Sequence, residues 1–173
     1  MILIGISGRA QTGKSTSASY LTKKYGFKEF FFSEYVKQVA EVGGWNGLKD
    51  ERGRRYLQHL GDTMREYNES IFIDEIRSKI ITYKLMCEDT NKEPRIVISD
   101  VRLVSEINAL KVLGASMWFI KRNVDISNIP THSTEQLTED SFKFDYVFDN
   151  NGSFNQLYAG IDQAIKETIN GTI

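Results

Sequence analysis

Eight residues near the N-terminus have the types and spacing of a phosphate-binding loop (P-loop). Residues 8–15 read Gly-Arg-Ala-Gln-Thr-Gly-Lys-Ser and match the pattern G-x-x-x-x-G-K-[ST] at every fixed position. In such a loop, backbone N–H groups converge on phosphate oxygens, and the N-terminus of the next helix adds a favourable dipole. Lys14 can then reach the β- and γ-phosphates, and the Ser15 hydroxyl can bind Mg²⁺. We therefore expect a nucleotide phosphate chain to be bound by Gly8, Arg9, Ala10, Gln11, Thr12, Gly13, Lys14, Ser15 and Thr16.

The segments on either side of this loop predict the strand and the helix that a P-loop requires. The apolar run 2–6 is typical of a strand buried on both faces of a parallel sheet. Between Lys14 and Tyr25, apolar residues recur at helical spacing, and Gly26 provides a C-terminal stop. An ordinary glycine-rich turn is the alternative, but it does not explain this strand–loop–helix context.

One carboxylate and several arginines are further candidates for chemistry. Asp100 follows the apolar run 96–99, so it can orient a water of the Mg²⁺ shell or contact a substrate hydroxyl; the alternative is a helix cap. Phosphoryl transfer also needs cations around the transferring group. Segments expected at the site contain or adjoin Arg9, Arg65, Arg102 and Arg122. A second group begins a predicted helix, where a solvated face is the alternative: Arg52, Arg54 and Arg55.

The rest of the chain predicts an α/β domain with a helical insert. Further strands are expected at 30–32, 95–99, 117–120 and 144–148, each separated from the next by helix. Ser33 can cap the helix after the second strand, and the glycine-rich segment 43–47 opens an insert at about 43–94. Five strands joined through right-handed crossovers give a five-stranded parallel sheet in a three-layer α/β/α P-loop NTPase fold. The core of this single domain is then 1–42 and 95–173, with a lid at about 121–141 on which Arg122 could close.

Composition excludes several other functions. The chain has 173 residues, of which 40% are hydrophobic and 26% charged, as is typical of one globular domain. With 22 Lys plus Arg against 23 Asp plus Glu, the net charge of −1 gives no field for binding nucleic acid or an anionic membrane. Cys87 has no second cysteine for an internal disulfide, and one Cys with two His makes no usual zinc cage. No signal peptide or membrane span is expected, which favours the cytoplasm.

Several motifs resemble those of bacteriophage-type deoxynucleoside monophosphate kinases. They are residues 54–62 (Arg-Arg-Tyr-Leu-Gln-His-Leu-Gly-Asp), Asp100-Val101-Arg102 with Glu106, and the segments 113–115, 131–135 and 145–153. The likeness runs from the P-loop to the final helix. It implies an adenylate-kinase-like core with ATP on the P-loop, a deoxynucleoside monophosphate under the helical insert, and Mg²⁺ between the ATP phosphates.

The resemblance also implies which residues bind the acceptor. Lys37 and Arg55 would bind the monophosphate, Gly61 and Asp62 would lie near the nucleotide, and Phe72 would pack on its base or sugar. The acceptor side would further include Asp100, Arg102 and Glu106, with Arg65, His132 and Glu135 as additional candidates. Because the acceptor is itself a phosphate anion, catalysis would rest on positioning and charge neutralisation, with Mg²⁺ and the catalytic candidates Lys14, Asp100, Arg102 and Arg122. Asp62 replaces Thr of the family pattern and Phe72 replaces Trp, which leaves the base preference open.

Other interpretations stay open at this stage. Phosphomevalonate and dephospho-coenzyme A kinases are similar around residues 100–102 and the Asn-Asn-Gly turn at 150–152. A P-loop nucleotide switch is a weaker alternative, because the sequence has no N-K-x-D element. His132 and Glu135 could form a metal pair, but without a third soft ligand a helix start capped by Thr131 or Ser133 is the simpler interpretation. A homodimer is also open.

Overall fold

The computed structural model describes residues 1–123 and 137–169. Five strands alternate with helices along the chain, and a short 3₁₀ helix precedes the last strand. In chain order, the elements are β1 (Ile2–Ser7), α1 (Lys14–Tyr25), β2 (Lys28–Phe30), α2 (Ser33–Val42), α3 (Glu51–Tyr67), α4 (Ile71–Asp89), β3 (Arg95–Ile98), α5 (Val104–Val112), β4 (Ser116–Lys121), η3 (Glu139–Ser141), β5 (Tyr146–Asp149) and α6 (Phe154–Ile169).

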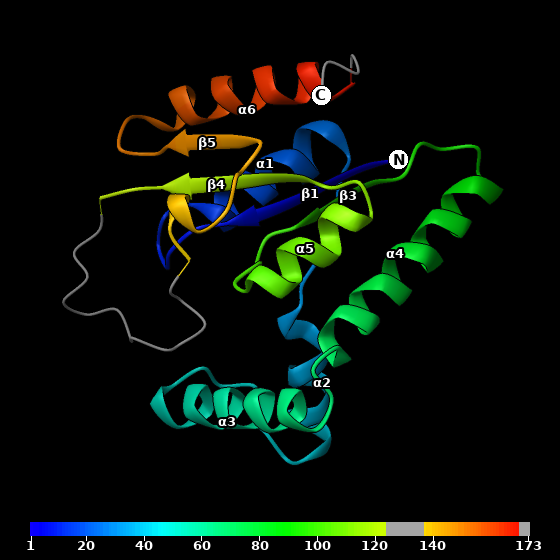
Figure 1. The fold of residues 1–173 in the computed structure, drawn as a ribbon, viewed down its shortest axis with the longest axis vertical. Helices are drawn as coiled ribbons and strands as arrows, with labels where there is room; N and C mark the ends of the chain where they lie inside the picture. The colour runs from blue at the N-terminus through cyan, green and yellow to red at the C-terminus, as the bar shows by residue number, and fades with distance from the viewer. Residues whose placement is uncertain (124–136, 170–173) are drawn as a thin grey trace.

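All five strands form one parallel sheet with the order β2-β3-β1-β4-β5 (Figure 1). Strand β1 lies in the middle and pairs with β3 and β4, and all six of its residues are buried. A strand covered on both faces has no reason to alternate apolar and polar residues, which explains the nearly continuous apolar run that predicted it. The expected parallel sheet with a central first strand is confirmed.

Two hydrophobic clusters cover the two faces of the sheet. On one face, α1 and α6 pack against Ile4 and Ile6 through Leu21 and Ile161, together with the fully buried Trp118. On the other face, Leu3 of β1 contacts a cluster to which α2, α4 and α5 contribute, including Val36, Ile76 and Ile107. Helices therefore lie on both sides of the sheet, and the predicted three-layer α/β/α fold is confirmed.

Helices α2, α3 and α4 form an extension on one side of the sheet. Helix α2 packs against both α3 and α4. In Figure 1, α3 lies apart from the sheet, whereas α4 runs back toward it along one side of the molecule. Helix α3 begins where the Asp50 carboxylate accepts a hydrogen bond from the Gly53 N–H at 2.7 Å. None of the helices in the described ranges is long and apolar enough to cross a bilayer.

Several boundaries differ from the sequence prediction by one or two residues; the last strand, for example, is Tyr146–Asp149 rather than 144–148. Strand β2 is Lys28–Phe30 rather than 30–32, because the chain turns into α2 at Phe32. Ser33 does not cap α2 with its side chain; it is the first helical residue, and the carboxylate of Asp100 caps the helix instead. The aromatic run 30–32 favoured a strand locally, but the distant carboxylate at Asp100 fixes where the helix starts.

Candidate phosphate-binding and acceptor site

The P-loop joins the carboxyl end of β1 to the N-terminus of α1, as its sequence predicted. Gly8 has a φ of 139° and Gly13 a φ of 108°, a conformation that side chains rarely adopt. A Cβ at Gly8 would lie 2.3 Å from the Ile120 carbonyl oxygen of β4, and one at Gly13 would lie 2.4 Å from Asn150 Nδ2. Both glycines are therefore required by conformation and by space.

Asn150, at the end of β5, holds the P-loop in place. Its side chain is buried, and Nδ2 donates a hydrogen bond to the Thr12 carbonyl oxygen at 2.8 Å. Its backbone N–H donates to the Lys121 carbonyl oxygen at 2.8 Å, which ties it to the end of β4. The sequence placed Asn150 in a turn and in the 145–153 motif of the resemblance, but it predicted no role for the side chain. The available signal was an amide side chain directly after a strand that ends at the P-loop edge of the sheet.

Lys14 and Ser15 begin α1 at the end of this loop. The Lys14 ammonium donates hydrogen bonds to the carbonyl oxygens of Gly8 and Arg9, both at 2.6 Å, so its side chain folds back over the loop. The Ser15 side chain is exposed beside it. The first turn of α1 carries no acidic residue, so the positive end of the helix dipole is not neutralised by its own side chains. The arrangement suits a polyphosphate and an accompanying cation.

Asp100 connects the end of β3 to α2. Its Oδ1 accepts a hydrogen bond from the Phe32 N–H at 2.8 Å and its Oδ2 accepts one from the Ser33 N–H at 2.9 Å. The structure thus shows the helix-cap role that was the alternative for this residue, and contact with substrate or Mg²⁺ stays a prediction. The next residue, Val101, is tied to β1: its N–H donates to the Ile6 carbonyl oxygen at 3.3 Å, and its carbonyl accepts from the Ser7 hydroxyl at 3.0 Å.

Lys37 lies on the helix that Asp100 caps. Burial lowers the pKa of Lys37, and the charges of Lys49 and Arg102 lower it further, whereas Asp100 and Glu34 act in the opposite direction. Since the charges of Asp100 and Arg102 act on Lys37, these three groups lie in one neighbourhood, and their contact with an acceptor stays a prediction. The lowered pKa means that nearby carboxylates do not fully compensate the Lys37 ammonium for its partial burial. A bound anion could supply that compensation, so Lys37 is suited to bind one.

Arg65 and Glu106 lie at the centre of a cluster that also includes Asp62 and Phe72 and that we call the acceptor-side cluster. Glu106 is 3% exposed, and its Oε2 accepts hydrogen bonds from the N–H groups of Arg102 and Leu103 at 2.8 and 3.1 Å. Arg65 Nη2 lies 3.9 Å from Glu106 Oε1, and Arg65 Nη1 lies 3.6 Å from Asp62 Oδ1. Burial raises the pKa of Glu106 from 4.5 to about 7 and outweighs the backbone hydrogen bonds and the Arg65 charge that oppose the shift.

Phe72 belongs to the core of this cluster. Its side chain is 3% exposed, the Arg65 guanidinium carbon lies 4.6 Å from the ring centroid, and Tyr35 meets it edge-on at 6.3 Å. The resemblance implied that this ring packs on a base or sugar. Because the guanidinium of Arg65 covers the ring, such a contact would require Arg65 to move. Gly61 lies beside Arg65 on α3, where an added Cβ would be 3.6 Å from Arg65 Nη1.

The remaining candidates are less closely tied to the cluster. Arg55 is exposed near the start of α3, and Figure 1 shows that this end of α3 lies on the same side of the molecule as the P-loop. Arg122 is exposed directly after β4, next to the ion pair of 3.0 Å between Lys121 and Glu139. The candidates His132 and Glu135 lie outside the described residues, as does the middle of the expected lid. Within residues 1–123 and 137–169, no three His, Cys, Asp or Glu side chains gather into a metal site.

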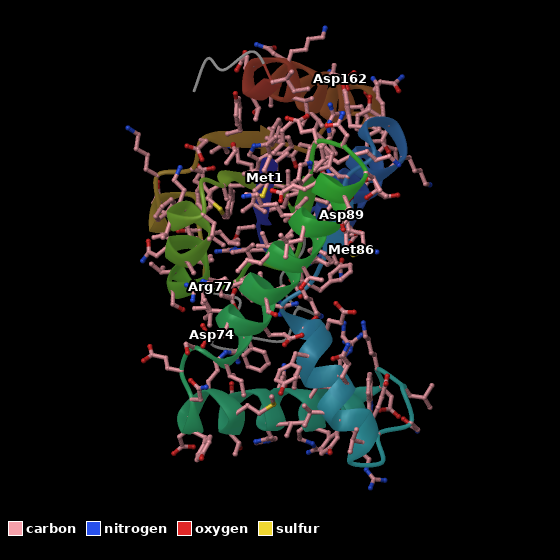
Figure 2. The ribbon with its side chains drawn as sticks, turned by 90° about the vertical axis from the view of Figure 1, so that its right-hand side faces the viewer. Met1, Asp74, Arg77, Met86, Asp89 and Asp162 are labelled. Carbon is pink, nitrogen blue, oxygen red and sulfur yellow. The ribbon has the colours of Figure 1, made fainter. Side chains whose placement is uncertain are left out.

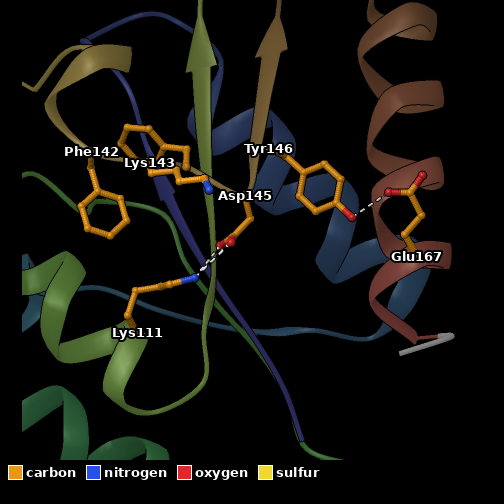
Figure 3. A pocket seen from close by; sticks show the side chains of 7 residues that line it. Lys111, Phe142, Lys143, Asp145, Tyr146 and Glu167 are labelled. Carbon is orange, nitrogen blue, oxygen red and sulfur yellow. Dashed lines mark hydrogen bonds and ion pairs between the residues drawn. The ribbon is translucent and has the colours of Figure 1, made fainter. Parts of the chain in front are cut away.

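A separate cavity lies at the opposite edge of the sheet. It has a volume of about 630 Å³ and is lined at the start of β5 by aromatic and charged side chains (Figure 3). Lys111 pairs with Asp145 at 3.0 Å, and Asp145 accepts the Met117 N–H at 2.6 Å, while the Tyr146 hydroxyl donates to Glu167 at 2.8 Å. The P-loop follows the carboxyl ends of the strands, whereas this cavity surrounds an amino end. Its polar groups stabilise the fold, and the cavity is not part of the phosphate site.

The fold and the loop together define a three-layer P-loop domain. Solved structures with the same fold include a dephospho-CoA kinase from Campylobacter jejuni, with a TM-score of 0.55 at 14% identity over 99% of this chain and 98% of that chain. A shikimate kinase from Aquifex aeolicus has a TM-score of 0.54 at 15% identity over 98% and 99% of the two chains. At these identities the likeness concerns the fold alone.

Sequence comparison defines the family more narrowly. Residues 52–161 match the family described as deoxynucleotide monophosphate kinase. A protein of Acanthamoeba polyphaga mimivirus named "Putative deoxynucleotide monophosphate kinase" is 30% identical over 184 residues, covering 93% of this chain and 94% of that protein. The chain therefore belongs to the deoxynucleotide monophosphate kinase family, and the resemblance seen in its motifs is confirmed. The matched range begins after the P-loop, so the motif at residues 8–15 supports the kinase assignment independently.

Replacing Asp100 should weaken the start of α2. Asp100→Ala removes both acceptors of the Phe32 and Ser33 N–H groups, and hydrogen bonds to a charged group are worth about 1.5–3 kcal/mol each. We expect the free energy of unfolding in urea to fall by about 2 kcal/mol or more. Asp50→Ala, which removes the cap of α3, is the matched control and should cost only about 1 kcal/mol. An Asp100→Ala variant as stable as the wild type would exclude the capping role.

The pKa of Glu106 predicts a pH-dependent stability. A carboxyl group with a pKa of 4.5 when unfolded and about 7 when folded binds more protons in the folded state between these values. Its contribution to stability is therefore full below pH 4.5 and is lost as the pH rises through about 7. Glu106→Gln keeps a hydrogen-bond acceptor without the charge, so its unfolding free energy should rise relative to the wild type across this interval. Urea titrations at several pH values measure this difference in unfolding free energy. Glu66→Gln, at an exposed position, is the control. If the unfolding free energies of Glu106→Gln and the wild type changed with pH in parallel, the shifted pKa of Glu106 would be contradicted.

Proposed function

We propose that this enzyme transfers the γ-phosphoryl group of ATP to a deoxynucleoside monophosphate, producing ADP and a deoxynucleoside diphosphate. The observation that carries the proposal is the P-loop at the carboxyl end of β1 together with the cations on α2, on α3 and in the segment before α5. Family membership supports the acceptor class. The acceptor phosphate oxygen attacks the γ-phosphorus, and the bond between that phosphorus and the oxygen bridging to the β-phosphate breaks, which releases ADP.

The donor half of the site is the P-loop. Backbone N–H groups of residues 8–15 would bind the phosphates, and Lys14 would exchange its loop carbonyl contacts for the β- and γ-phosphates. The exposed Ser15 hydroxyl would be an oxygen ligand of the Mg²⁺ that accompanies ATP. Bound Mg²⁺ neutralises charge that develops on the transferring group. Asp100 would contribute by positioning α2 and, through water, by orienting that shell.

The acceptor half of the site lies between the helical extension and α5. Lys37, Arg55 and Arg102 would neutralise the monophosphate, with Arg65 held near it by its stack on Phe72. The extension at about 43–94 would act as the acceptor-binding insert and residues 121–141 as a lid. Closure would exclude water and bring Arg122 to the transferring group, which suppresses hydrolysis of ATP. A cytoplasmic location remains the expectation for such an enzyme.

A coupled ADP-release assay tests the reaction directly. The acceptors tested are dTMP, dGMP, dCMP, dAMP and their ribonucleotide counterparts, each with ATP and Mg²⁺. Dephospho-coenzyme A, the acceptor of a related kinase class, is tested in the same way. Turnover with one or more deoxynucleotides, and none with dephospho-coenzyme A, is the expected result. If dephospho-coenzyme A alone were phosphorylated, the proposed acceptor class would be wrong although the P-loop chemistry would stand.

Lys14→Ala should abolish most of the activity. The substitution removes a preorganised positive group from the transferring phosphate, and loss of one such donor costs about 100-fold or more in kcat. The matched control is Lys23→Ala, an exposed lysine in the last turn of α1, which should retain wild-type turnover. Near-normal turnover of Lys14→Ala with dNMP and ATP would falsify the assignment of the P-loop as the donor site.

Gly61→Ala should affect the stability of α3 and the binding of the acceptor in different ways. Gly61 is a helical residue whose added Cβ would make only ordinary contacts, 3.6 Å from Arg65 and 3.7 Å from Val36. Alanine should therefore stabilise α3 by about 0.5–1 kcal/mol, because glycine loses more backbone entropy in a helix. If Gly61 borders the nucleotide, the same methyl group raises the KM for the acceptor and leaves the KM for ATP unchanged. An unchanged acceptor KM would remove Gly61 from the site.

A further inference from the structure

Two asparagines in the turn between β5 and α6 contact separate parts of the chain. Asn150 is 4% exposed, and its side chain donates a hydrogen bond to the Thr12 carbonyl oxygen of the P-loop. Its backbone N–H donates to the Lys121 carbonyl oxygen at the end of β4. The Oδ1 atom of Asn151 accepts the Asn123 N–H at 2.8 Å, just beyond that strand. The turn therefore joins the P-loop to the segment that follows β4, and Figure 1 shows both strand ends on one side of the molecule.

Arg122 lies between the two residues of that segment that the turn holds. The Lys121 carbonyl precedes it and the Asn123 N–H follows it, so the backbone is tied to the turn on both sides of this arginine. Residues two apart along a strand share a face of the sheet, which places Arg122 on the face of Ile120. A Cβ added at Gly13 would lie 4.0 Å from Ile120 Cγ2, so this is the face on which the P-loop leads into α1.

Helices α1 and α6 keep the P-loop and the turn at a fixed separation. Asp162 of α6, labelled in Figure 2, accepts hydrogen bonds from the hydroxyls of Tyr20 and Tyr25 at 2.9 and 2.7 Å. It also accepts one from the Lys24 ammonium at 2.7 Å, and the ring of Tyr20 stacks on that of Tyr158 with centroids 4.0 Å apart. Because α1 begins at the P-loop and α6 begins at the turn, these contacts fix the starts of the two helices relative to each other.

We propose that Asn151 is a positioning residue for phosphoryl transfer, which holds the backbone of Arg122 so that its guanidinium can reach the transferring phosphoryl group. Asn151 acts through Asn123 and Arg122, while Asn150 holds the other side of this arginine and the P-loop. A long side chain on a fixed backbone samples fewer positions, so less entropy is lost when its guanidinium meets the phosphoryl group. The inference rests on the proposed function, which supplies the group on which Arg122 acts.

The contact between Asn151 and Asn123 contributes little to folding. Both side chains are exposed, and a hydrogen bond that water can replace adds little to the free energy of unfolding. Loss of this contact should therefore affect the geometry of the site much more than the stability of the fold. A purely structural role for Asn151 predicts that catalysis does not depend on it.

Asn151→Ala tests the contact in the ADP-release assay. The kcat should fall about 5-fold or more, and the KM values for ATP and for the deoxynucleotide acceptor should not change. Asn68→Ala is the matched control, because Asn68 Oδ1 also accepts a backbone N–H, that of Ser70 at 3.1 Å, in the exposed turn between α3 and α4. This control should retain the wild-type kcat, and circular dichroism confirms that both variants are folded. A wild-type kcat for Asn151→Ala would overturn the proposal.

A double-variant cycle tests whether Asn151 acts through Arg122. Arg122→Ala should lower kcat about 100-fold or more. Arg77→Ala, which removes an exposed arginine on α4 in Figure 2, should not lower it. Adding Asn151→Ala to Arg122→Ala should change kcat by less than about 2-fold, because the residue to be positioned is already absent. Two effects that multiply, or a wild-type kcat for Arg122→Ala, would overturn the proposal.

Calorimetry with MgATP in the absence of an acceptor separates this role from damage to the P-loop. Asn151→Ala should bind MgATP with the wild-type dissociation constant, because the bond between Asn150 and Thr12 is retained. A dissociation constant raised as much as kcat falls would mean that Asn151 supports the P-loop instead, which would overturn the proposal. If the wild-type enzyme phosphorylated no acceptor, the proposed function would fail and this role with it. If it did phosphorylate one and the cycle were additive, only the role of Asn151 would fail.

Discussion

The site depends on how closely the P-loop backbone approaches the ends of β4 and β5. Gly8 leaves no room for a Cβ beside the Ile120 carbonyl, and Gly13 leaves none beside the Asn150 side chain. The loop can have this conformation only if β4 lies next to β1 and β5 next to β4, as the strand order β2-β3-β1-β4-β5 provides. The P-loop is thus held from the other half of the chain, and Asn150 makes that connection with a single buried hydrogen bond to Thr12.

Two carboxylates organise the acceptor side by binding backbone rather than ligand. Asp100 accepts the first N–H groups of α2, and Glu106 accepts those at the start of α5. Lys37 is carried by α2, which Asp100 caps, and Arg102 donates its own N–H to Glu106, so the two carboxylates help to set the positions of these two cations. Each carboxylate already accepts hydrogen bonds from backbone N–H groups, and these bonds offset part of its negative charge. It therefore attracts the neighbouring arginines and Lys37 less strongly. Net positive potential therefore remains where a phosphate would bind.

Features determined by local sequence were predictable, and features determined by distant contacts were not. The P-loop, the buried strand β1 and the three-layer fold follow from motif spacing and apolar runs. The cap of α2 could not be found this way, because the Phe32 N–H and the Asp100 carboxylate are 68 positions apart. The same holds for Asn150, which is 138 positions from Thr12. For Phe72, the resemblance implied a contact with a base or sugar, whereas the buried position of the ring against Arg65 and Tyr35 depends on packing between separate helices.

Arg65 is the residue for which the acceptor-side geometry has the clearest chemical consequence. Its ion pairs with Asp62 and Glu106 are 3.6 and 3.9 Å long, beyond the length of a good hydrogen bond, so neither carboxylate fixes its N–H donors. The guanidinium is held instead by its stack on Phe72 at 4.6 Å. Glu106 has a pKa of about 7, so at neutral pH it holds Arg65 with only part of a full negative charge. A phosphate dianion carries more charge than either carboxylate, so in the proposed reaction Arg65 would exchange these long ion pairs for hydrogen bonds to the acceptor phosphate while it keeps its stack on Phe72.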